Sequence, residues 1–427
     1  MKKSYIISIL LLAVIALPAT TFTSKSLLFA DSFMLRAKGS DANYWNPALL
    51  NKEDRNISLP ALNTAIMLGN NSFDLDFYEY FVNLEYLEEK DKERILDAID
   101  EKIAINLASN VGIFGFTIGK MALSSSAHLA ATSAISEDYL ELLLYGNGMV
   151  DSTNVDSTLV FEFKKDDNYL EAQSYVDLTF GMGDIRVPLS DTIAPLRFGI
   201  SGSILAGAGD IHTQEYEGAF HTSLSEGMSL NQKIRMRTGL GGIGFKSLLG
   251  VAWDPVQNLS TGVTLDNVLG FINWQMECAE YSYEVDADSI YVVDYEEDLA
   301  DIFPEDYTET EIESYTTRLP MEMRLAALYR FPWVSLSTDL VKGFGNSAYV
   351  SEDPRFSFGA EFTPLEVLPI KIGFATGNDI YPWRASYGIG LKIKAVEFGF
   401  GLQSIESILP GMSSKGVALA TYFNLRI

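Results

Sequence analysis

The side chains that most often carry chemistry are few in this 427-residue chain, and they lie far apart. The three histidines, His128, His212 and His221, show none of the spacings of common zinc motifs. The single cysteine, Cys278, excludes an intramolecular disulfide and a multi-cysteine metal site. The sequence has no Gly-x-Ser-x-Gly nucleophile motif, and the glycines of residues 239–244 lack the ending of a phosphate loop. We therefore expect no enzyme activity, no metal and no cofactor.

An acidic stretch is the most unusual local feature. From Glu277 to Glu313 there are fifteen Asp or Glu residues and no Lys or Arg, with tyrosines interleaved. A calcium-binding EF-hand loop aligned at Asp286 fails, because Ile290 stands where an oxygen ligand is needed and Tyr291 where glycine is needed. We expect a solvated external loop over residues 277–313, with loose affinity for divalent cations.

The overall charge narrows the choice of partners. The chain carries 57 acidic and 31 basic residues, for a net charge of −26, yet its mean hydropathy is slightly positive at +0.09. The acidity argues against nucleic acid, whose binding needs clustered basic residues. A membrane β-barrel explains both the negative net charge and the positive mean hydropathy, because its apolar residues face lipid and its charged residues lie in the loops and the lumen. A large acidic soluble protein is the alternative.

The N-terminus has the pattern of an export signal. Lys2 and Lys3 precede an apolar run from Tyr5 to Leu17, which is too short for a membrane-spanning helix. We assign residues 1–30 to a signal peptide, with cleavage after Ala19 or Ala30. Because no later apolar run reaches about 18 residues, a mature protein that enters a membrane must do so as strands.

Strict alternation of apolar and polar residues marks the C-terminal third. It runs through Phe356–Thr363, Ile370–Phe374, Tyr387–Lys394, Val396–Gln403 and Val417–Ile427. A period of two indicates β-strands with one apolar face, and repeated strands of about ten residues are typical of membrane barrels. A soluble β-sandwich would show the same alternation. Together with the signal peptide, the strand length and repetition predict an all-β fold: a single transmembrane antiparallel β-barrel of about 14 strands, with 12 and 16 as alternatives.

Upstream of this region we expect further short strands, and some of them are parts of longer strands. The stretches Gln232–Leu240 and Gly244–Trp253 are two such pieces, and Ser260–Leu265 and Leu269–Val285 are two more. Two short helical insertions are expected near residues 87–100 and 136–144, the second with Ser136 as its N-cap.

A short motif near the mature N-terminus carries a family resemblance. Tyr44, Trp45, Asn46 and Pro47 begin a Tyr-Trp-Asn-Pro-Ala-Leu sequence. It resembles the N-terminal plug motif of the FadL-like outer-membrane β-barrels, which include long-chain fatty-acid transporters and PorV-like shuttle subunits. The segments 239–253, 265–274, 359–369 and 409–417 resemble an uncharacterised branch of these barrels. The chain departs from the usual pattern in ending on Ile427 instead of an aromatic residue.

The resemblance implies a domain organisation and a function. We expect a plug segment at residues 31–56 and a barrel at residues 57–427, in the bacterial outer membrane. The implied function is passive transport of a hydrophobic small molecule, with outer-membrane lipid as the other partner. The alternative is a non-transporting barrel that docks or shuttles partner proteins. An apolar pocket continuous with a lateral gap would favour transport, and a lumen filled by salt bridges would favour docking.

Orientation follows from loop length. In such barrels the periplasmic turns are short and the extracellular loops are long. The connections at residues 277–313 and 340–356 are among the longest after the plug segment, and we expect the acidic segment 277–313 to face outward.

Overall fold

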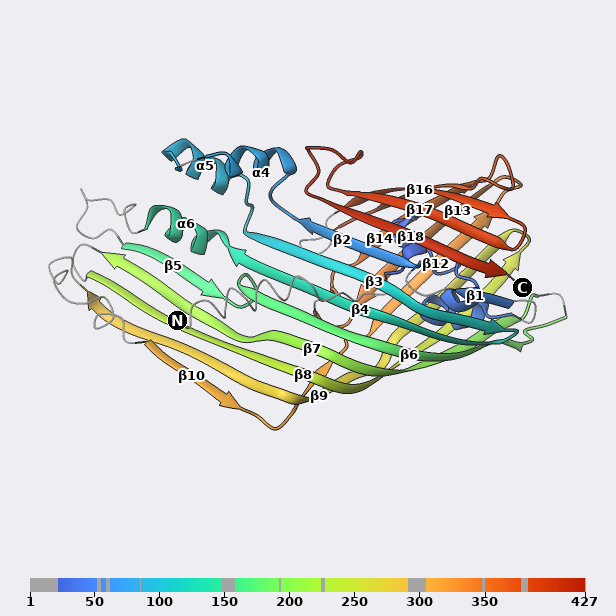
Figure 1. Ribbon diagram of the computed structural model, residues 1–427, viewed down its shortest axis with the longest axis horizontal. Helices are drawn as coiled ribbons and strands as arrows, with labels where there is room; N and C mark the ends of the chain where they lie inside the picture. Colours follow the sequence, from blue (N-terminus) through green and yellow to red (C-terminus); the bar gives the residue numbers. More distant parts are fainter. Residues whose placement is uncertain are drawn as a thin grey trace.

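The computed structural model describes residues 22–51, 55–58, 62–84, 86–146, 158–191, 193–223, 227–290, 305–347, 350–377 and 383–426. Within these residues, 18 strand segments form one antiparallel sheet (Figure 1). They are β1 (Arg55–Ser58), β2 (Thr64–Asn70), β3 (Lys102–Ile118), β4 (Met121–Ser136), β5 (Thr158–Lys164), β6 (Tyr169–Val187), β7 (Leu196–Ser223), β8 (Gly227–Val256), β9 (Leu259–Ile290), β10 (Glu305–Glu311), β11 (Tyr315–Arg318), β12 (Glu322–Arg330), β13 (Val334–Gly343), β14 (Arg355–Phe362), β15 (Ile370–Ala375), β16 (Arg384–Ile393), β17 (Val396–Ile405) and β18 (Gly416–Arg426).

Several segments are pieces of one barrel strand. Segments β1 and β2 both pair with β18 and β3, segments β5 and β6 both pair with β7, and segments β10, β11 and β12 all pair with β9. The sheet closes on itself because Leu419 of β18 lies opposite Ile66 of β2. The predicted 14-stranded antiparallel β-barrel is confirmed.

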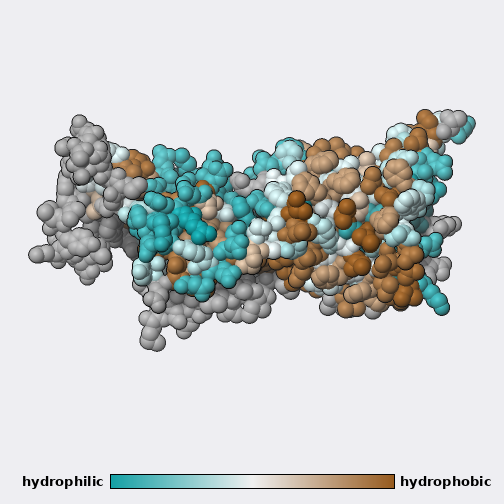
Figure 2. Space-filling model, turned by 90° about the horizontal axis from the view of Figure 1, so that it is seen from above, coloured by the Kyte–Doolittle hydropathy of each residue, from teal (hydrophilic) through white to brown (hydrophobic). Residues whose placement is uncertain are grey.

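Alternation along each strand gives the barrel its two surfaces. In β17, Val396, Phe398 and Phe400 point outward and are 38–47% exposed, whereas Gly401 and Gln403 face the interior. Figure 2 shows apolar side chains gathered over the half of the barrel that holds β16–β18, and hydrophilic side chains over the other half. An apolar outer band of this kind is the surface that a membrane-spanning barrel presents to lipid.

Three strands run far beyond the length that a bilayer requires. Strands β7, β8 and β9 have 28, 30 and 32 residues, against about 9–11 for a membrane crossing. The sequence pieces 232–240 and 244–253 are therefore one strand, β8. Figure 1 shows these strands extending away from β16–β18, toward the end where the helices gather.

The acidic stretch is partly strand, so its interpretation as a loop was wrong for residues 277–290 and 305–311. Residues 277–290 complete β9 and residues 305–311 form β10, with Tyr283 opposite Tyr307. Arg237 of β8 forms a 2.8 Å ion pair with Glu280 of β9, which offsets part of the negative charge. Residues 291–304, with the EF-hand position Tyr291, lie outside the described residues.

Short helices lie both inside the barrel and at its extended end. The inner elements are α2 (Ser24–Leu27), η2 (Gly39–Asp41), α3 (Ala42–Trp45) and η3 (Pro47–Leu49). The outer ones are α4 (Leu75–Val82), α5 (Glu89–Asp97) and α6 (Glu137–Tyr145). Helices were expected where α5 and α6 lie, and Ser136 accepts from the Tyr139 N–H as the N-cap of α6. Helix α4 was not predicted. Among the described helices, none combines the length and apolarity needed to cross a bilayer.

The two ends of the barrel differ in their connections. At one end a two-residue turn, Gly119–Lys120, joins β3 to β4, and residues 394–395 join β16 to β17. At the other end, residues 71–101 join β2 to β3 and residues 406–415 join β17 to β18. We call these the short-turn end and the long-loop end. The connections at residues 277–313 and 340–356 both belong to the long-loop end.

Candidate functional site

The N-terminal segment, residues 22–50, lies inside the barrel, and we call it the plug. Its apolar side chains, among them Leu27, Leu28, Met34 and Leu50, are 0% exposed and form one core with inward-facing wall residues. The segment expected at residues 31–56 overlaps it: residues 31–50 lie in the lumen, whereas residues 55–58 already form β1. Phe22 to Ala30, which the sequence analysis placed in the signal peptide, are also buried here.

Tyr44 connects the plug to a buried carboxylate on the wall. Its hydroxyl donates a 2.8 Å hydrogen bond to Oδ1 of Asp177 on β6. The Nε2 atom of His128 on β4 lies 2.6 Å from Oδ2 of the same carboxylate, and the Ser126 N–H donates to Oδ1 at 3.0 Å. Burial, reinforced by Asp177, raises the pKa of Tyr44 well above its usual value, so the hydroxyl stays protonated and can donate.

Trp45 is the central apolar side chain of the plug. It is 1% exposed, and its ring meets Phe33 edge-on with centroids 5.4 Å apart. The guanidinium of Arg324 on β12 lies 4.2 Å from its ring centroid, within the range of a cation–π contact. The indole N–H donates to the Thr23 hydroxyl at 3.2 Å, so the ring also joins the two ends of the plug.

Asn46 and Pro47 form the turn that leads out of α3. Asn46 has an extended backbone, and its side-chain oxygen accepts the Ala48 N–H at 3.1 Å, which caps η3 with Pro47 at its first position. Its amide group donates to the Val251 carbonyl on β8 at 3.1 Å. The four motif residues therefore reach three different parts of the wall from one turn.

Wall glycines make room for the plug, and the sequence analysis missed them. A Cβ added to Gly183 would lie 1.7 Å from the Pro47 carbonyl oxygen, and one added to Gly199 would lie 2.3 Å from the Ala48 nitrogen. A Cβ at Gly373 would lie 2.2 Å from the Phe29 carbonyl carbon. Only glycine permits this approach of two backbones. Glycines at inward-facing strand positions were the available signal.

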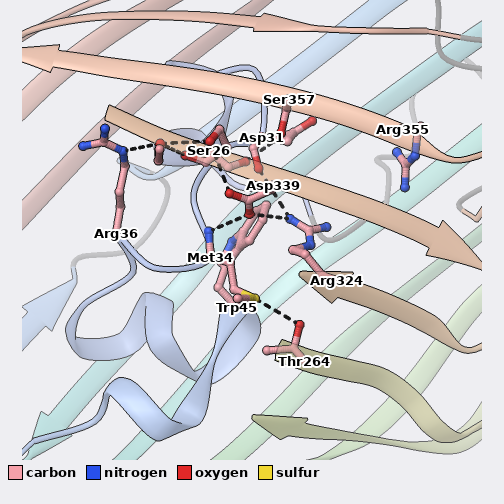
Figure 3. A network of polar contacts seen from close by, with 12 residues as sticks. Ser26, Asp31, Met34, Arg36, Trp45, Thr264, Arg324, Asp339, Arg355 and Ser357 are labelled. Atoms are coloured by element: carbon pink, nitrogen blue, oxygen red, sulfur yellow. Dashed lines mark hydrogen bonds and ion pairs between the residues drawn. The ribbon is translucent and has the colours of Figure 1, made fainter. Parts of the chain in front are cut away.

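A second buried carboxylate, Asp339 on β13, holds the other side of the plug (Figure 3). It accepts the Met34 N–H at 3.1 Å and the Ser32 hydroxyl at 3.2 Å. Arg324 lies 3.9 Å from it and pairs with Glu322 at 2.9 Å, and Glu322 pairs in turn with Arg355 at 2.7 Å. This network was not found from the sequence, because its members lie about 300 residues from the plug.

Polar contacts also cross the lumen on the long-loop side of the plug. Asp210 on β7 accepts from Gln173 on β6 at 2.8 Å and from the hydroxyl of Tyr315 on β11 at 2.9 Å. His212 lies 2.7 Å from the same carboxylate. The Gln173 amide also donates to Thr317 at 2.8 Å. At this level hydrogen-bonded side chains cross the lumen.

Beside the plug, between β1 and β2, the backbone pairing with β18 is interrupted at Asn63. There the Asn63 amide donates to the Phe423 carbonyl and its side-chain oxygen accepts the Phe423 N–H, both at 3.1 Å, whereas its backbone carbonyl still accepts the Gly112 N–H of β3 at 2.7 Å. Residues 59–61 lie outside the described residues. Strand β3 shifts its register at the same level, between Gly112 and Phe114. A cavity of about 30 Å³ lies between this interruption and the plug, lined by Tyr44, Asn63 and Phe114 among others. That volume suits about one water molecule.

Comparison with known proteins gives a family. The model of a family of unknown function (DUF5723) matches residues 47–400. The chain belongs to this family. No curated protein matches the chain.

Solved structures similar to this DUF5723 protein include two toluene transporters and a FadL homologue. The Ralstonia pickettii toluene transporter TbuX is 12% identical, covers 92% of this chain and 95% of its own, and gives a TM-score of 0.48. A Pseudomonas aeruginosa FadL homologue is 10% identical, covers 96% of this chain and 98% of its own, and gives a TM-score of 0.47. The Pseudomonas putida toluene transporter TodX is 6% identical, covers 96% of both chains and gives 0.41.

Proposed function

We propose that this DUF5723 protein is an outer-membrane barrel that passes a hydrophobic small molecule passively through its wall, beside the plug. The observation that carries the proposal is the wall interruption at Asn63. There, the Asn63 side chain takes the place of backbone pairing with β18, and a cavity lies between it and Tyr44 of the plug.

A lateral route suits an apolar solute better than an axial one. Along the axis, hydrogen-bonded side chains cross the lumen on the long-loop side, and the plug occupies the barrel below. At the interruption, by contrast, the outer surface carries apolar side chains such as Phe114, which is 39% exposed. An apolar solute that leaves here enters lipid directly and avoids the cost of hydration.

The plug must move for such passage, because the cavity beside it is too small for a solute. Our test locks the plug with a disulfide. The hydroxyls of Ser32 in the plug and Ser337 on β13 are 2.8 Å apart, so cysteines at both positions lie within bonding reach. The variant S32C/S337C is made in a C278A background to avoid side reactions with Cys278.

The measurement is uptake of a labelled fatty acid or alkane into liposomes that contain the protein. We expect oxidation to suppress uptake and a reductant to restore it. The control pair is S404C/S414C, whose parent hydroxyls are also 2.8 Å apart but join β17 to its following loop without touching the plug. Uptake that is equal in liposomes with and without the protein would contradict transport.

Docking of partner proteins is the second candidate, and the length of β7, β8 and β9 favours it. These strands continue well past the length that a bilayer requires, and their extension carries charged side chains and tyrosines. Tyr307 on this extension is 62% exposed. A photo-crosslinking residue at position 307 should give discrete protein adducts in cells if the extension docks a partner, and none if it does not.

A further inference from the structure

A second cavity lies at the short-turn end, between the plug and the wall. Its volume is about 300 Å³. It is lined by six cationic side chains: Lys25, Arg36 and Lys38 of the plug, and Arg330, Lys371 and Lys392 of the wall. Three carboxylates share the lining: Asp41, Glu361 and Glu397. Six cations less three carboxylates leave the lining with a formal charge of +3, whereas the whole chain carries −26.

Three of these cations form no ion pair with a carboxylate among the residues that the structure describes. Arg36 donates to the hydroxyls of Ser335 and Ser337 at 2.7 and 2.8 Å. Lys371, which is 4% exposed, donates to the Tyr422 hydroxyl. Arg330 donates to the Ser260 hydroxyl at 2.8 Å. Neutral acceptors fix these groups in place without a direct ion pair, which is costly for Lys371, the buried one of the three.

Apolar rings form the rest of the wall. Phe29 and Phe33 of the plug and Phe331, after β12, also line the cavity. The guanidinium of Arg36 lies 4.4 Å from the ring centroid of Phe29, so fixed positive charge and an aromatic surface are adjacent. A ligand with an anionic group next to an apolar group would satisfy both.

We propose that this cavity binds a phosphate group carried by a small molecule or a lipid. A phosphate monoester carries about −1.5 to −2 charges at pH 7 and has three strong acceptor oxygens, which matches an excess of three cations better than a single carboxylate does. Charge-assisted hydrogen bonds from Lys and Arg are the usual means of holding such a group. Because plug and wall each supply three of the cations, a bound phosphate also ties the plug to the wall.

Binding is measured by titration calorimetry on the purified full-length protein in a neutral detergent at low ionic strength. The probes are inorganic phosphate and hexyl phosphate. We expect saturable binding by the wild type and about tenfold weaker binding by R330Q/K392Q, equivalent to about 1.4 kcal/mol. The control R186Q removes a cation that lies outside the cavity, with a 60% exposed side chain, and should bind like the wild type.

The two probes separate the sources of the phosphate. Equal affinity for both indicates free phosphate, and tighter binding of hexyl phosphate indicates a phosphate on an apolar carrier. The proposal is overturned if the wild type shows no saturable binding, if R330Q/K392Q binds as tightly, or if hexanoate binds as tightly as hexyl phosphate. Should R330Q/K392Q fail to fold, K38Q replaces it, since Lys38 is exposed on the plug. Because no transport is measured, the result does not depend on the proposed channel function.

Discussion

The Tyr44 hydroxyl and the Asp177 carboxylate, 2.8 Å apart, join the plug to the barrel wall across 133 residues of sequence. Asp177 is 1% exposed and also contacts His128, so plug, β4 and β6 share one buried polar network. The Tyr44 hydroxyl is therefore one of the polar groups that hold the plug on this side, and Asp339 holds it on the other.

Removing that hydroxyl should loosen the plug without opening the barrel. In Y44F the ring is kept, but Asp177 loses one of its donors, at a cost of about 1–2 kcal/mol. We expect faster hydrogen–deuterium exchange over residues 22–50 and unchanged exchange in β16–β18. Y78F, on α4 with a 41% exposed side chain, is the matched control. Unchanged exchange in the plug of Y44F would show that the hydrogen bond does not hold it.

A single methyl group on the wall should displace the turn of the plug. In G199A the new Cβ would lie 2.3 Å from the Ala48 nitrogen, so η3 must shift, at a cost of about 1–3 kcal/mol. We expect limited proteolysis to cut within residues 22–50 while the barrel keeps its heat-modifiable migration on gels. G411A is the control, because nothing lies within 4 Å of its added Cβ. Equal protease resistance in the two variants would argue against a tightly packed plug.

The packing of residues 22–30 leads us to expect signal cleavage after Ala19 and not after Ala30. Leu27, Leu28 and Ala30 are 0% exposed inside the barrel, and Lys25 pairs with Asp41 at 2.5 Å. Cleavage after Ala30 would remove these contacts. Mass spectrometry of the protein purified from membranes should find Thr20 as the first residue. A mature chain that starts at Asp31 would show that the contacts of residues 22–30 are dispensable.

The long-loop end should face the cell exterior. In a C278A background, E309C on β10 should react with a membrane-impermeant maleimide in intact cells, because Glu309 is exposed on the strand extension. E366C, in the exposed turn between β14 and β15 at the short-turn end, should react only after the outer membrane is permeabilised. The reverse pattern would mean that the barrel has the opposite orientation.

The sequence predicted the barrel because the C-terminal strands alternate strictly, as β17 does. It split β8 and β9 because bulges interrupt that alternation. The register of the β8–β9 pair shifts between Lys246 and Leu248, and Gly241 and Asn267 have positive φ values of 51° and 53°. Each register shift changes the face of the sheet on which the following residues lie. The alternation along one long strand is therefore broken, and its sequence has the pattern of two short strands.

Less of the candidate site could be predicted. The motif at Tyr44–Pro47 stood out as a local pattern, but its partners Asp177 and Val251 are distant in sequence and belong to no pattern of their own. Charge alone was misleading for the acidic stretch, because the Arg237 that offsets it lies on the neighbouring strand. Helix α4 did carry a local signal that was overlooked: Asp74 accepts the Phe77 N–H at 2.8 Å as an N-cap.

The pairing of the first strand with the last determines the order in which the barrel can assemble. Ile57 of β1 lies opposite Leu425 of β18, so the ring cannot close until nearly all of the chain is present on the same side of the membrane. Until then, any partial sheet has two unpaired edges whose N–H and C=O groups are open to other chains. Contacts this distant in sequence also form slowly. The growing sheet therefore has to be kept from aggregating until β18 arrives, and the plug can be enclosed only when the sheet curls around it.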